Sequence, residues 1–156
     1  MKNQILKAAT VSSLVVALTI TFVVAPAAAD SFGSIRVVVP FDFTAGRSMF
    51  PAGKYTLRSG WGNTNGVIRI TSEDGETSGL LLTNSAESVQ PKNESVLIFH
   101  RYGDQYFLFQ VWEIGDTIGE EIPKSSMERQ AVRTIEANKG QSATVGEIAT
   151  VTIAAS

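Results

Sequence analysis

The 156-residue sequence has no cysteine and only one histidine, and both shortages restrict what the protein can be. Without cysteine, small disulfide-stabilised scaffolds and cysteine-ligated zinc sites are excluded. A lipid anchor on a processing-site cysteine is excluded for the same reason. With His100 as the single histidine, a histidine-rich metal site is impossible, and a Ser-His-acid triad would have to be built on that residue. The Gly-x-Ser-x-Gly motif, on which many hydrolases carry their nucleophile, is missing as well.

The sequence also lacks a strong charge of either sign. It carries 13 basic and 15 acidic residues, for a net charge of −2. Lys2 and Lys7 lie in the first 29 residues, so the rest of the chain has a net charge of −4. A mildly acidic chain gives no electrostatic reason to bind nucleic acid, and no nucleic-acid partner is expected.

Residues 1–29 have the pattern of a secretory signal peptide. Two lysines precede an apolar run at Leu14–Val24, and small residues follow at Ala27-Ala28-Ala29. These alanines fit an Ala-x-Ala cleavage site, so we expect cleavage after Ala29 and a periplasmic or secreted mature chain of residues 30–156. The alternative is an uncleaved anchor, because residues 8–29 are nearly long enough to span a bilayer. Cleavage is favoured, and no membrane span is then expected in the mature chain.

Residues 30–156 are predicted to form one β domain. Apolar residues recur with period two in short runs, and Gly, Asn, Asp and Pro separate these runs, which is typical of strands and turns. Pro40 predicts an edge strand or a bend, because proline cannot donate a hydrogen bond to a sheet. The seven expected strands cover residues 35–43, 54–59, 67–71, 80–83, 96–102, 105–112 and 147–154.

The strongest hairpin signal joins residues 96–102 to residues 105–112 through Gly103-Asp104. Glycine in the first loop position is typical of a type II′ turn. A two-residue loop would place Tyr102 opposite Gln105, His100 opposite Phe107, Ile98 opposite Phe109 and Val96 opposite Val111. Both faces of this hairpin are largely apolar, so we expect a cover on each of them.

One cover is predicted from residues 125–138. Ser125 and Glu128 have the spacing of a capping box, and Met127, Ala131, Val132 and Ile135 recur at helical spacing. The fold class is therefore all-β and mostly antiparallel, with about seven strands in a small barrel or sandwich and one amphipathic helix before the last strand. A barrel is preferred, because the last strand could seal the edge left by the first.

Several segments resemble a group of small signal-bearing proteins of acidobacteria and similar soil bacteria. They are VPFDF at Val39–Phe43, FPAGKY at Phe50–Tyr55, FHRYGDQYFL at Phe99–Leu108, and Pro123–Ser125 with Glu128-Arg129. The resemblance covers most of the mature chain, and HRYGDQYFL is its most specific part. It implies export and a shared fold, and it carries over no catalytic residue.

Two features could carry chemistry, and each also has a structural explanation. His100 could be catalytic, but a histidine held in a sheet by a carboxylate or a carbonyl is the favoured interpretation. Glu113, Asp116, Glu120 and Glu121 could bind calcium or supply a glycosidase pair. The EF-hand spacing is missing, and a solvated acidic loop is favoured. No metal, no cofactor and no enzymatic activity are expected.

Aromatic residues are the predicted ligand contacts: Trp61, Tyr102, Tyr106 and Trp112. Trp61 lies in a Gly/Asn-rich connection, where a large ring either covers the core or stacks on a ligand. The favoured function is a non-enzymatic, exported binding or structural module for a protein or glycan. The alternative is a barrel that carries a small apolar ligand in a cavity lined by Phe107, Phe109 and Val111. The oligomeric state stays open.

Overall fold

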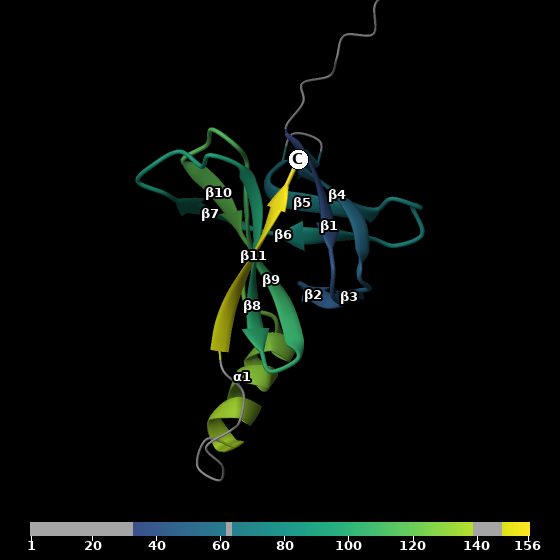
Figure 1. The fold of residues 1–156 in the computed structure, drawn as a ribbon, viewed down its shortest axis with the longest axis vertical. Coiled ribbons are helices and arrows are strands. Elements are labelled where there is room, and N and C mark those ends of the chain that lie inside the picture. The colour runs from purple at the N-terminus through teal and green to yellow at the C-terminus, as the bar shows by residue number, and fades with distance from the viewer. Residues whose placement is uncertain (1–32, 62–63, 139–147) are drawn as a thin grey trace, which may run out of the picture.

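The computed structural model describes residues 33–61, 64–138 and 148–156, and these form a sandwich-like, mostly antiparallel β structure with one helix (Figure 1). The first sheet has the strand order β1-β4-β5-β6. Its strands are β1 (Ser34–Val39), β4 (Gly53–Trp61), β5 (Thr64–Ser72) and β6 (Ser78–Leu82). The predicted signal peptide at 1–29 lies outside the described residues.

The second sheet has the strand order β11-β8-β9-β10-β7. Its strands are β7 (Asn84–Glu87), β8 (Ser95–Tyr102), β9 (Gln105–Trp112), β10 (Ile118–Glu121) and β11 (Ile148–Ala155). A small hairpin of β2 (Phe43–Ala45) and β3 (Ser48–Phe50) joins this sheet through one parallel pairing, Thr44 with Phe107. The helix α1 (Ser126–Asn138) lies beyond the turn of the β8–β9 hairpin (Figure 1).

The sheets meet at two corners but form no closed barrel, so the preference for a barrel was wrong. At one corner the chain passes from β6 to β7 through Thr83. At the other, Arg36 and Ser156 exchange two backbone hydrogen bonds of 2.8 and 2.9 Å. The last strand thus reaches the first as expected, but along one residue pair only.

All seven expected strands are present, and four short ones were not predicted: β2, β3, β7 and β10. Each has three or four residues, which is too few to show a period of two. The bend predicted at Pro40 is confirmed, since the chain leaves the first sheet there and enters β2.

The β8–β9 hairpin has the predicted register next to its turn and a different one beyond it. Tyr102 pairs with Gln105 and His100 with Phe107, as expected, and Gly103 has the positive φ of 64° that a primed turn requires. Past Phe99 a β-bulge shifts the register by one, so Ile98 faces Gln110 and Val96 faces Trp112. The predicted pairs of Ile98 with Phe109 and of Val96 with Val111 were therefore wrong. A bulge adds one residue to one strand, and alternation of apolar residues does not show where.

The main core lies between the two sheets. In β1, Ile35, Val37 and Val39 point inward and alternate with exposed residues, as predicted. From the second sheet come Leu97, Phe99, Leu108 and Val111, and the rings of Phe43 and Phe50 from the β2–β3 hairpin complete the core. Phe43 meets Phe50, Tyr55 and Phe99 with ring centroids 5.3–5.4 Å apart. The β2–β3 hairpin thus closes one end of the sandwich with two phenylalanines.

A second, smaller cluster lies on the opposite face of the hairpin. Ile135 of α1 is buried against Tyr102 and Phe107, with Ala131 and Val132 packed at its edge. The predicted helical cover is confirmed, but it covers only the turn end of the hairpin. Met127 was predicted to be part of the apolar face and is instead 40% exposed.

The other end of the same face is closed by Trp112 against Gly119 of β10. A Cβ added to Gly119 would lie 2.5 Å from the indole ring, so the ring occupies the space that a side chain would need. We predict that Gly119→Ala lowers the free energy of unfolding by about 1–3 kcal/mol, because the ring must shift. Gly53→Ala is the matched control, since its Cβ would meet other atoms only at 3.7 Å and beyond. Equal urea midpoints for the two variants would contradict this packing.

Candidate functional site

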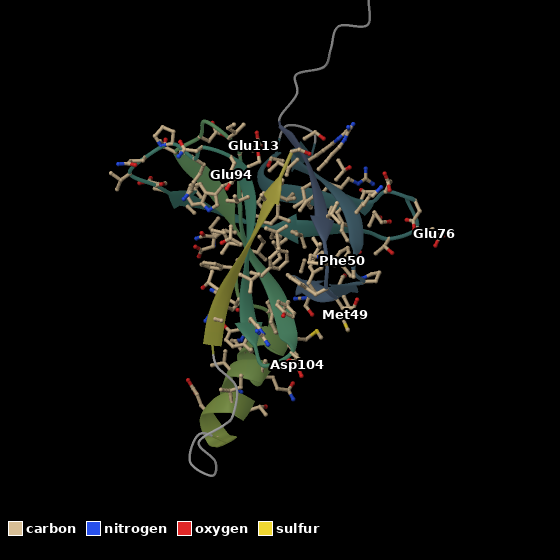
Figure 2. The ribbon with its side chains drawn as sticks, viewed as in Figure 1. Met49, Phe50, Glu76, Glu94, Asp104 and Glu113 are labelled. Carbon is tan, nitrogen blue, oxygen red and sulfur yellow. The ribbon has the colours of Figure 1, made fainter. Side chains whose placement is uncertain are left out.

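The best-formed pocket near the predicted aromatic residues is a groove between α1, the β2–β3 hairpin and the β8–β9 turn. Its volume is about 650 Å³ and it is open to solvent. Figure 2 shows Met49 on β3 and Asp104 in the β8–β9 turn at this end of the molecule. Side chains from three separate segments therefore form its walls, among them Thr44, Met49, Tyr102, Tyr106, Phe107, Met127, Ala131 and Ile135. We call this the methionine groove.

The β2–β3 hairpin positions the first methionine. Phe43 and Phe50 are buried in the core, and their stacked rings hold the hairpin in place. Met49 precedes Phe50 in β3, and because side chains alternate along a strand it points the other way. Its side chain is 68% exposed. Met127 lies in the first turn of α1, across the groove.

The start of α1 is fixed by the predicted cap. The backbone N–H of Glu128 donates to Oγ of Ser125 at 3.1 Å, which satisfies one of the free donors of the first turn. The second half of a capping box would return the Glu128 carboxylate to the backbone of Ser125. Instead the carboxylate points into the sheet, where its side chain is buried. The cap at Ser125 was predicted correctly, but the contact of the Glu128 carboxylate with the sheet was not predicted.

Glu128 accepts two hydrogen bonds from the β8–β9 hairpin on one oxygen. The Tyr102 hydroxyl donates to Oε1 at 3.1 Å, and Nδ1 of His100 lies 2.8 Å from the same atom. Since Oε1 acts as an acceptor, Nδ1 of His100 carries the hydrogen. A carboxylate in the first turn of a helix is also stabilised by the partial positive charge there. We call these three residues the Glu128 cluster.

The Glu128 cluster explains the predicted position of His100. The favoured interpretation, a histidine held in the sheet by a carboxylate, is what the structure shows. The imidazole stacks on Phe109 with ring centroids 4.0 Å apart and an interplanar angle of 22°. A nucleophile would need a hydroxyl hydrogen-bonded to the other ring nitrogen. The described residues supply no such bond to His100.

Burial and the nearby carboxylate act on Tyr102 together. Desolvation, followed by the negative charge of Glu128 and the hydrogen bond to it, raises the pKa of Tyr102 to about 12. The hydroxyl therefore remains protonated at neutral pH and acts as a donor. Every buried side-chain nitrogen and oxygen in the described part of the chain has a hydrogen-bond partner. The polar cluster beneath the groove is fully satisfied, which favours a structural role for it.

The four predicted ligand contacts do not form one site. Tyr102 and Tyr106 both line the methionine groove. Tyr106 is half-buried, and one face of its ring stacks on Phe41 with centroids 3.8 Å apart. Trp112 lies at the far end of β9, buried against Gly119, with Lys92 above its ring at 4.5 Å and its Nε1 donating to Gln110. The side chain of Trp61 lies outside the described residues.

Two residues that shape this site were missed by the sequence analysis: Met49, which lines the groove, and Glu128, which lies beneath it. Met49 lies between the strands predicted at residues 35–43 and 54–59, so nothing in the sequence indicated that it would lie beside α1. Glu128 was read as a capping residue only. The sequence did contain a signal for Glu128. It lies seven positions before Ile135, and positions seven apart share a face of a helix, so this carboxylate lies on the apolar face.

The acidic segment contains a small pocket of about 160 Å³ at the opposite end of the molecule, where Figure 2 labels Glu113. Glu113, Asp116 and Glu120 line it, and the Glu113 carboxylate lies against the backbone of Gly33. Glu120 accepts a hydrogen bond from Thr83, and Glu121 accepts one from Gln110. Among the described residues, no group of three His, Cys, Asp or Glu residues is arranged to hold a metal ion.

Comparison with known proteins adds no identification. No protein family, curated protein or solved structure matches this chain. The resemblance to small signal-bearing proteins of acidobacteria therefore stays a prediction. Within the described residues, no helix has the length and apolar character needed to cross a membrane.

The Glu128 cluster should contribute strongly to stability. Glu128→Ala would leave the Nδ1–H of His100 and the hydroxyl of Tyr102 without an acceptor, and each buried unpaired group costs about 1–3 kcal/mol. We therefore expect the free energy of unfolding, measured in urea, to fall by about 2–4 kcal/mol. Glu136→Ala, on the exposed side of α1, should change it by less than about 0.5 kcal/mol. If both variants are equally stable, the carboxylate does not hold the helix.

Glu113 should make stability depend on pH in the opposite way to an ordinary ion-paired carboxylate. Burial first, and then the charges of Asp116 and Glu120, raise the pKa of Glu113 above its usual value. Its neutral form is favoured in the folded state, so stability is lost as the pH rises through the folded pKa. Glu113→Gln should raise the melting temperature at pH 7 and change it little at pH 4. An equal gain at both pH values would show that charge is not the cause.

Proposed function

We propose that this protein is an exported, non-enzymatic binding module, and that the methionine groove receives an apolar segment of a partner protein. Export is supported by the signal-peptide pattern of residues 1–29. The observation that carries the binding role is the pair of exposed methionines, Met49 and Met127, on opposite walls of a groove of about 650 Å³. Exposed methionines adapt their shape to an apolar ligand and are common at such surfaces.

A protein segment fits the groove better than a glycan does. Sugar rings stack on open aromatic faces, but Tyr106 already stacks on Phe41 and Trp112 is buried elsewhere. The groove offers two flexible apolar side chains, Met49 and Met127, over a floor that includes Ile135. Its polar neighbours are Gln105, Gln130, Asp42 and Asp104. An apolar surface rimmed by a few polar groups is typical of recognition of an apolar peptide face.

The carrier of a small apolar ligand has less support. Its predicted cavity required Phe107, Phe109 and Val111 to line one space. Val111 points into the main core, whereas Phe107 packs beneath α1 and Phe109 stacks on His100. These side chains lie on opposite faces of β9, and the sheets form no closed barrel.

The methionines themselves provide a test of the proposed function. Residues 30–156 contain only two, Met49 and Met127, so ¹³C-methyl labelling gives one signal from each wall of the groove. Peptides selected from a random library for binding to this protein should shift both signals. Met49→Lys should weaken binding tenfold or more, because the buried amine would lose its hydration.

Leu82→Lys is the matched control, since Leu82 is 75% exposed on β6 and does not line the groove. This variant should bind the selected peptides like the unmodified protein. Peptides that bind tightly and leave both methyl signals in place would show that the binding site lies elsewhere.

A further inference from the structure

The strands of the first sheet differ in charge from the rest of the molecule. β1, β4, β5 and β6 contain Arg36, Lys54, Arg58 and Arg69 and no aspartate or glutamate. The whole chain nevertheless has more acidic than basic residues, 15 against 13. The strands of this sheet therefore carry only positive charge, while the acidic residues next to them, Glu73, Asp74 and Glu76, lie in the β5–β6 turn.

All four cations lie on the outer face of the first sheet. Each is exposed and has buried neighbours in its own strand, such as Val37 in β1, Leu57 in β4 and Ile70 in β5. The strand register brings them close together. Arg58 is directly opposite Arg69, and Arg36 is opposite Thr56, which is itself opposite Thr71. Neighbouring strands are about 4.8 Å apart, so the cations cover one compact surface. We call it the basic face.

Arg58 and Arg69 place like charges at directly opposite positions of the sheet. The ion pair of Lys54 with Glu73, at 3.2 Å, is formed by two largely exposed side chains and is therefore weak. A hollow of about 670 Å³ lies beside it, lined by Arg36, Lys54, Thr56, Thr71 and Ser72, by the one side-chain carboxylate of Glu73, and by the end of β11. Cations and hydroxyl groups of this kind are suited to an anionic ligand.

Exposed apolar side chains border the cations on the same face. Val38 lies opposite Lys54, Leu80 lies opposite Arg69, and Leu82 lies opposite Val67. These three apolar side chains are 60%, 59% and 75% exposed. Leu80 and Leu82 belong to β6, which is the edge strand of the sheet. A soluble polyanion would use the cations alone and would leave the leucines in water.

We propose that the basic face docks on the surface of an anionic phospholipid bilayer. The arginines and Lys54 contact lipid phosphates, and Leu80 and Leu82 enter the boundary between headgroups and acyl chains. Two weak signals, charge and a small apolar insertion, together give stable but reversible attachment. The methionine groove is built from other elements, so the protein can bind a membrane and a partner through different surfaces.

Vesicle co-sedimentation tests the proposal. The protein of residues 30–156 should bind vesicles of phosphatidylcholine with about 30% phosphatidylglycerol at about 0.1 M salt, and not vesicles of pure phosphatidylcholine. Each basic residue near an anionic surface strengthens binding about fivefold, so Arg36→Gln with Arg58→Gln should weaken it about 30-fold. Arg47→Gln with Arg133→Gln removes the same charge from other elements and should leave binding unchanged. Leu80→Ser with Leu82→Ser should weaken it several-fold.

A second measurement reads the depth of insertion directly. Because the chain has no cysteine, Leu82→Cys allows a single nitroxide label on β6, and Ile114→Cys, 64% exposed in the β9–β10 connection, gives a matched control. Paramagnetic relaxation should place the label at position 82 within the lipid and the label at position 114 in water.

Three outcomes would overturn membrane docking. The first is equal binding to vesicles with and without anionic lipid. The second is equal loss of binding in both double arginine variants, which would show that only net charge matters. The third is a label at position 82 that stays in water, together with binding of dextran sulfate that depends on Arg36 and Arg58. That result would assign the basic face to an anionic polymer.

Discussion

The β8–β9 hairpin is apolar on both faces, and most of the molecule is arranged to cover it. On the inner face Leu97, Phe99, Leu108 and Val111 pack against the first sheet and form the main core. The outer face cannot use the same sheet, so separate elements cover its two ends: α1 at the turn and β10 beneath Trp112 at the other end. Without these covers the apolar rings of Phe107 and Trp112 would lie in water. α1 covers the turn end of the hairpin but does not reach the β2–β3 hairpin. The space between α1 and the β2–β3 hairpin is the methionine groove.

A polar interaction holds this cover in place. Among the described apolar side chains of the helix, only Ile135 is buried, which is a small apolar area for thirteen residues. Glu128 adds a directional contact, since its carboxylate reaches two donors on the hairpin from the capped first turn. Apolar packing fixes how close the helix lies to the hairpin, and the two hydrogen bonds to Glu128 fix where its first turn lies along the hairpin. A buried carboxylate is tolerated because both donors and the helix terminus compensate for its desolvation.

Alternation and turn chemistry were sufficient to predict the long strands, the hairpin turn at Gly103 and the helix cap at Ser125. They could not show the bulge between the pairs made by Phe99 and Ile98, because one inserted residue leaves the local pattern intact on either side. The site was predicted only in part. Tyr102 and Tyr106 come from a strong hairpin signal, whereas Met49 reaches them through a three-residue strand and Glu128 through a helix. Contacts between distant segments depend on tertiary packing, which a local pattern does not contain.

Three surfaces of the molecule differ in their charge: the acidic segment, the outer face of the first sheet and the methionine groove. Carboxylates collect around the β9–β10 connection, where burial and like charges raise the pKa of Glu113, and four cations lie on the outer face of the first sheet. The methionine groove lies at the opposite end of the molecule from these carboxylates, and two charged residues line it, Asp42 and Asp104. An anionic surface would be repelled by the carboxylates around the β9–β10 connection and by the two aspartates of the groove, and attracted by the cations of the first sheet. Attachment through the first sheet would thus orient the molecule and leave the groove free for a partner.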